Sequence, residues 1–159
     1  MSLRGFSVAL AVALLSGGVV LAQGQDSGAI RKLAFLSGSW HCAVGGTGVP
    51  KGVVDHLSYE FSPDWSWMIE RSRSVGNAQT YWSAQLWGYD AHRKQLVAYK
   101  FDSTGVSTKS VDGWVGDRFL SKRDDNGATV SITPVNSNTF KWVIESADHS
   151  SVVTEVCTR

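Results

Sequence analysis

Histidine residues are the first candidates for chemistry, because imidazole serves both as a metal ligand and as a general base. The chain has four of them, His41, His56, His92 and His149, and no two have the spacing of a zinc site. His41 is next to Cys42, but adjacent residues of a strand face opposite ways and do not easily share a metal. The sequence therefore predicts no metal site.

Serine and carboxylate residues give no catalytic signature. The chain lacks the Gly-x-Ser-x-Gly pattern that places a nucleophilic serine on a strained turn. Asp55 and His56 are neighbours, and on a strand they would face opposite ways. Glu60 and Glu70 lie on predicted strands, where they could be interior carboxylates, but we expect both to face solvent. We therefore expect a protein that is not an enzyme.

Aromatic residues form the most informative pattern. They crowd three successive predicted strands: Trp65, Trp67, Tyr81, Trp82, Trp87, Tyr89, Tyr99 and Phe101. Such a set can pack as a core, or it can line a pocket with a few polar groups, the usual form of a small-molecule site. For the pocket, the candidate wall residues are Trp67, Trp82, Trp87 and Phe140.

Arg71 and Arg73 are the candidate anchors for a ligand. They share the alternation face of Trp67 and Ile69. If that face is interior, each arginine needs an anionic partner, and a ligand carboxylate would serve. If that face is exterior, both are solvated. The sequence leaves the two alternatives open.

The first 22 residues have the features of a signal peptide. Arg4 provides the positive start, Phe6 to Leu15 is almost continuously apolar, and Ala22 is a small residue suited to cleavage. The apolar run is short for a membrane span, and no basic flank follows it. We predict an exported protein, periplasmic or secreted, without stable membrane insertion after cleavage, and a polar linker over residues 23–28.

Export would favour a disulfide between the two cysteines. Cys42 lies near the start of the mature chain and Cys157 two residues from its end. In an oxidising compartment such a pair is expected to form a disulfide. The loop it would close is long, and the chain-entropy estimate of its contribution is roughly 4–5 kcal/mol.

Residues 29–159 are predicted to form one all-β domain. A short helix is indicated by the spacing of Ile30, Leu33 and Leu36, and Gly38 would end it. No long helix separates any two of the later strands, so an antiparallel meander is favoured over parallel units. The predicted strands are 39–45, 53–61, 65–75, 80–89, 94–102, 106–115, 117–122, 128–132, 139–146 and 151–158, and residues 134–138 are predicted as a turn.

Alternation along the strands assigns their faces and indicates a closed sheet. Leu57, Tyr59 and Phe61 share one face of their strand, as do Phe140, Trp142 and Ile144 of theirs. If the first and last strands pair with Cys42 opposite Cys157, then Trp40 falls opposite Arg159. The guanidinium could then lie over the indole, a contact worth about 0.5–2 kcal/mol.

Composition excludes some partners. The 159 residues carry a formal net charge of +1, and removal of residues 1–22 leaves a net charge of zero. Nucleic acids and anionic membranes both demand a basic footprint, so neither is expected as the main partner.

An ordered set of motifs resembles the calycin superfamily of lipocalins, fatty-acid-binding proteins and nitrobindin-like barrels. The set includes Gly38-x-Trp40 after the short helix and Arg159 at the end of the last strand. Within the group, the chain is most similar to an uncharacterised family of exported bacterial lipocalin-like proteins. Their Phe-Leu-x-Gly-x-Trp-x-Cys start, Gly-Tyr-Asp hairpin and late cysteine match residues 35–42, residues 88–90 and Cys157. The resemblance implies a calycin-like barrel and names no ligand.

These observations predict an exported barrel that binds a small, mostly apolar molecule and needs no cofactor. The first alternative is a structural or protein-interaction barrel with a filled interior. An enzyme of the cell envelope is a further alternative. Haem held by a histidine inside the barrel is another, which the nitrobindin resemblance raises, although His41 to Val44 interrupt the glycine-rich stretch of those barrels.

Overall fold

The computed structural model describes residues 27–76 and 80–159. The predicted signal peptide, residues 1–22, therefore lies outside the described residues, as does most of the predicted linker. The last two residues of that linker are not linker, because Ser27–Arg31 form helix α1. A single 3-10 turn, η1, follows at Ala34–Leu36. No helix within the described ranges is long and apolar enough to cross a membrane.

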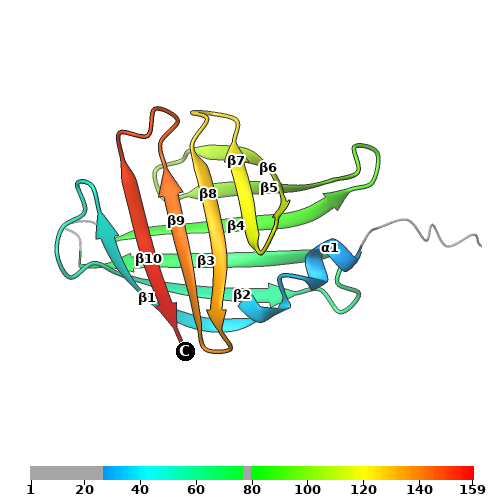
Figure 1. Ribbon diagram of the computed structural model, residues 1–159, viewed down its shortest axis with the longest axis horizontal. Coiled ribbons are helices and arrows are strands. Elements are labelled where there is room, and N and C mark those ends of the chain that lie inside the picture. Colours follow the sequence, from blue (N-terminus) through cyan, green and yellow to red (C-terminus); the bar gives the residue numbers. More distant parts are fainter. Residues whose placement is uncertain (1–26, 77–79) are drawn as a thin grey trace, which may run out of the picture.

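The remaining chain forms a closed antiparallel barrel of ten strands (Figure 1). Each strand pairs with its neighbours in the sequence, and the first pairs with the last. The predicted all-β meander and its closure are therefore confirmed. The strands are β1 (Gly38–Gly46), β2 (Val54–Phe61), β3 (Trp67–Val75), β4 (Tyr81–Asp90), β5 (Gln95–Asp102), β6 (Ser107–Val115), β7 (Arg118–Arg123), β8 (Thr129–Asn136), β9 (Thr139–Glu145) and β10 (Val152–Thr158).

Strand β8 is longer than predicted. It continues through Pro134 to Asn136, where a turn was expected, and its pairing with β9 shifts register between these two residues. Proline has no N–H to donate, so it enters a sheet at a bulge, where the ladder is already interrupted. Pro134 was therefore a correct sign of irregular backbone, but not of a strand end.

Apolar side chains fill the end of the barrel that α1 covers. Helix α1 contacts β3 and β4 at this end (Figure 1). Ile30, Leu33 and Leu36 are fully buried, and the indole N–H of Trp40 donates to the Leu36 carbonyl over 2.6 Å. Inside the barrel the largest buried side chains of this cluster are Trp40, Tyr59, Trp87, Phe119 and Phe140. Edge-to-face and tilted ring contacts hold them together, which favours a rigid floor for the rest of the interior.

The seam between β1 and β10 closes the barrel. Cys42 pairs with Cys157 in the ladder, and the two form the predicted disulfide. The guanidinium carbon of Arg159 lies 4.4 Å from the centroid of the Trp40 ring, as this register predicts. Arg159 also donates to the carbonyls of Ser37 (2.9 Å) and Ser137 (2.7 Å), so it ties the start of β1 to the β8–β9 turn.

Candidate functional site

The half of the barrel away from α1 contains a cavity of about 230 Å³. The change along β3 shows where it begins: Met68 is fully buried in the apolar cluster, and Glu70 and Ser72 then line the cavity. On β4, Trp87 belongs to both regions and forms part of the cavity floor. The interior is therefore neither empty nor completely filled.

Three carboxylates face this cavity from three strands. Asp55 lies on β2, Glu70 on β3 and Glu155 on β10. Glu70 is 5% exposed and Glu155 is 7% exposed. One oxygen of Asp55 and one of Glu70 are buried without a hydrogen-bond partner, and none of the three carboxylates forms an ion pair within the described residues. Burial of such groups is costly unless something pairs with them.

Burial shifts the protonation of two of these groups. Burial, together with the nearby charges of Asp55 and Glu70, raises the pKa of Glu155 to about 8. Burial also raises the pKa of Glu70 to about 7, while the positive charge of Lys100 lowers it in part. At neutral pH the cavity therefore contains protonated carboxyl groups that would ionise if a cation entered.

Basic residues line the same cavity, and one of them is only two strands from Glu70. In the ladder, Glu70 pairs with Gln85, Gln85 with Lys100 and Lys100 with Thr108, so one glutamine separates the carboxylate from the ammonium. Lys100 lies 5.5 Å from the centroid of the Tyr81 ring, and Arg123 on β7 pairs with Asp125 at 3.0 Å. The positive charge of Lys100 therefore acts on both Glu70 and Glu155, without forming an ion pair with either within the described residues.

Two tryptophans supply apolar surface and unused donors. Trp87 and Trp142 both line the cavity, and they are 1% and 7% exposed. Their indole nitrogens are buried without a hydrogen-bond partner in the part of the chain that the structure describes. Buried polar atoms are usually paired in folded proteins, so the Trp142 donor is available to a ligand or to water, while the Trp87 donor also acts on Glu70 and lowers its pKa in part. The other apolar lining residues are Leu57, Ala98, Val130 and Ile144.

The predicted ligand-binding residues divide between the two faces of the barrel. Trp87 lines the cavity and Phe140 is buried in the apolar cluster below it. Trp67 and Trp82 lie on the outer face, 41% and 55% exposed. The prediction that they form part of the cavity wall is therefore wrong. The reason is their parity: each is next to an inward residue of its strand, Met68 and Ser83 respectively, and neighbours face opposite ways.

Arg71 and Arg73 take the exterior alternative. Both are exposed, and Arg71 pairs with Glu60 across to β2 at 3.0 Å. They cannot anchor a ligand in the cavity. Glu60 faces solvent as predicted, whereas the same prediction for Glu70 is wrong, because Glu70 shares the inward face with Met68.

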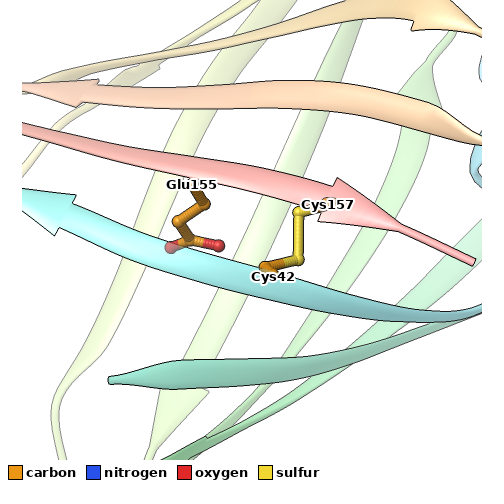
Figure 2. Close-up of side chains that lie close together, drawn as sticks. All are labelled: Cys42, Glu155 and Cys157. Carbon is orange, nitrogen blue, oxygen red and sulfur yellow. A yellow bond between two sulfur atoms is a disulfide. The ribbon is translucent and has the colours of Figure 1, made fainter. Parts of the chain in front are cut away.

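The four histidines lie outside the cavity, and one group of possible metal ligands lies beside it. All four histidines are exposed, so none of them could ligate a haem inside the barrel. Within the described residues, Cys42, Glu155 and Cys157 are the only group of three possible metal ligands whose donor atoms lie within 4.8 Å. Figure 2 shows Glu155 beside the disulfide that joins the two cysteines. Sulfurs in a disulfide are not thiolates, so this group does not fit a metal ion.

Comparison with known proteins adds a fold neighbour and no function. No protein-family model and no curated protein matches the chain. Among solved structures, a redesigned beta barrel is similar over 81% of this chain and 95% of its own length, at 9% sequence identity and a TM-score of 0.48.

Proposed function

We propose that this protein is an exported binding protein that holds a small molecule inside its barrel. The observation that carries the proposal is the cavity of about 230 Å³ with buried polar atoms that have no partner. A barrel with a purely structural role gains nothing from burying Glu70 and the Trp142 indole N–H beside an open space, because each unpaired group opposes folding.

The size and lining of the cavity describe the ligand. Its volume matches about eight waters at roughly 30 Å³ each, which is small for a ligand site and fits a molecule of about one ring. Trp87, Trp142 and Ile144 offer apolar contact to most of such a molecule. The carboxylates at one side leave room for one polar group, so we propose a ligand that is mostly apolar with a single polar head.

Two wider expectations belong to the same proposal. We place the protein in an oxidising compartment outside the cytosol, since its first and last strands are joined by a disulfide. We also propose a calycin-like barrel, on the grounds of Gly38, Trp40 and Arg159 at the seam. Binding rather than catalysis is proposed because no hydrogen bond within the described residues joins a serine of the cavity to one of its carboxylates, and Ser72 pairs with Ser83 at 2.8 Å instead.

Native mass spectrometry of the protein recovered from its own cell envelope tests the proposal directly. We expect a reproducible extra mass that disappears when the protein is denatured. The variant Ala98→Phe should lose the extra mass, because Ala98 is 1% exposed and its side chain borders the cavity. Ala43→Phe is the matched control on the exposed outer face of β1. Wild-type protein that stays free of ligand after incubation with envelope extract would overturn the proposal.

The runner-up is a protein-interaction barrel, and one observation favours it. The outer face of β3–β6 carries several exposed apolar side chains: Trp67, Trp82, Leu86, Tyr99, Phe101 and Val111. Exposed apolar patches of this kind mark interaction sites. If the cavity binds nothing, Trp82→Ser should weaken association with a partner and leave the stability of the barrel unchanged.

A further inference from the structure

We propose that the polar head of the ligand is an amine, which binds as its ammonium ion between Glu70, Glu155 and Asp55. This inference rests on the proposed binding function and names the class of its ligand. Two independent features point to it: carboxylates from three strands that face one cavity, and buried indole groups of Trp87 and Trp142 that border the same space.

The carboxylates suit an ammonium group because none of them forms an ion pair within the described residues, and the charge of Lys100 offsets those of Glu70 and Glu155 only in part. Arg123 is paired with Asp125 at the rim, and Lys100 lies against the Tyr81 ring, with Gln85 between it and Glu70. An ammonium ion has three N–H donors and no acceptor, and a carboxylate has only acceptors. Hydrogen bonds between such charged groups are about twice as strong as neutral ones.

The tryptophans also favour a ligand with an ammonium group. The faces of Trp87 and Trp142 can contact the apolar part of the ligand, and an indole face also attracts a cation within about 6 Å of its centroid. A ligand carboxylate would be repelled by the ionised forms of Glu70 and Glu155. An alcohol could donate one hydrogen bond but would leave their ionised forms unneutralised.

Proton release should accompany the binding of an amine. Without ligand, burial keeps Glu155 and part of Glu70 protonated near neutral pH. An ammonium ion favours their ionised forms, so protons leave as it binds. The titratable groups that face this part of the interior, all of which contribute to the pH profile, are Asp55, Tyr59, Glu70, Tyr81, Lys100, Asp112, Arg123 and Glu155.

A matched set of three probes tests the inference: 2-phenylethylamine, 2-phenylethanol and 3-phenylpropionate, titrated into the full protein by calorimetry. We expect the amine to bind about tenfold or more tightly than the alcohol, and the acid to bind weakest. Between pH 6 and pH 8 the affinity of the amine should rise, and buffers of different ionisation heat should report proton release. The amine itself stays charged in this range, since aliphatic amines have a pKa of about 10.

Variants locate the head group. Glu155→Gln and Glu70→Gln should each weaken amine binding about tenfold and flatten its pH dependence, while the affinity for 2-phenylethanol stays near that of wild type. Retained alcohol binding shows that the variant is folded. Glu60→Gln on the outer face is the matched control and should change neither affinity.

Each outcome separates this inference from the proposed function. If the alcohol or the acid binds as tightly as the amine, the cavity binds small molecules but the amine assignment is overturned. If none of the three probes binds, the amine assignment is overturned as well. The native mass spectrum then decides whether the proposed binding function also fails.

Discussion

At the scale of single residues, the inward glutamates distinguish this barrel from one with an apolar interior. Glu70 and Glu155 are buried and line the cavity, at inward positions that in most proteins are apolar. Their burial without a charged partner destabilises the ionised form of each, and this cost is visible as the raised pKa values. The protein therefore has buried groups whose charge depends on pH in the neutral range.

The stability of the barrel should consequently decrease as the pH rises. A carboxyl whose pKa is raised on folding binds more protons in the folded state than in the unfolded state. Its stabilising contribution is complete below the unfolded pKa of about 4 and is lost as the pH rises through the folded value. For Glu70 and Glu155 the folded values are about 7 and about 8, so the free energy of unfolding should fall by a few kcal/mol between pH 5 and pH 9.

Chemical denaturation of Glu155→Gln at pH 5, 7 and 9 checks this expectation. The amide does not ionise, so the variant should be more stable than wild type at pH 9, and the two should differ least at pH 5. Glu60→Gln controls for the loss of an exposed negative charge. A wild-type stability that is constant from pH 5 to pH 9 would contradict the raised pKa values.

The residues of the cavity could be predicted only in part. Alternation along β10 was a usable signal for Glu155, because it lies two residues before Cys157 and so shares the face of the disulfide. The same rule would have placed Glu70 inside from Met68, and Arg71 outside. What misled the prediction was residue type: acidic side chains were assigned to solvent, and tryptophans such as Trp82 were assigned to the interior. In a cavity with a polar lining, the usual assignment of acidic residues to the surface and of large apolar residues to the interior fails.

At the scale of elements, the ten strands were recognisable because turn residues separate them. The end of β1 shows how strict such positions are, since Gly45 and Gly46 are adjacent and have different surroundings. Gly46 has a φ of +130°, and a Cβ atom there would lie 2.1 Å from the carbonyl oxygen of Val152. At Gly45 a Cβ would meet nothing within 4 Å. The sequence pattern predicts both as turn residues, and it does not show which of them tolerates a side chain.

Alanine should therefore be much more destabilising at position 46 than at position 45. Gly46→Ala should lower the free energy of unfolding by about 2 kcal/mol or more, because the end of β1 must move away from β10 to accommodate the side chain. Gly45→Ala is the matched control and should change stability by less than about 1 kcal/mol. Urea denaturation of the two variants measures this difference in stability. Equal stability would contradict the prediction and would mean that β1 and β10 move apart at this end at little cost in free energy.

At the scale of the whole molecule, closure was predictable and the division of the interior was not. Pairing of the first and last strands followed from the positions of Cys42, Cys157, Trp40 and Arg159 on two strands. The boundary between filled and open halves depends on which side chains meet across the barrel. Phe119 and Trp87, for example, are 5.1 Å apart between ring centroids but come from strands that do not pair. Alternation within one strand contains no information about such contacts.

The disulfide should be the largest single covalent contribution to the stability of this closed form. It joins residues 115 positions apart, and loop closure of this length contributes roughly 4–5 kcal/mol in the chain-entropy model. The double variant Cys42→Ala, Cys157→Ala should therefore unfold at a much lower urea concentration than the oxidised wild type. Its unfolding should also have a steeper dependence on urea, because the unlinked chain exposes more surface when it unfolds.

Single variants separate loop closure from side-chain packing. Cys42→Ala and Cys157→Ala each break the link while retaining one buried sulfur, so each should lose almost as much stability as the double variant. A loss confined to the double variant would instead assign the effect to packing beside Glu155, with the ladder and Arg159 sufficient to hold the seam. In that case the barrel would also form in a reducing compartment, and the disulfide would no longer support an exported protein.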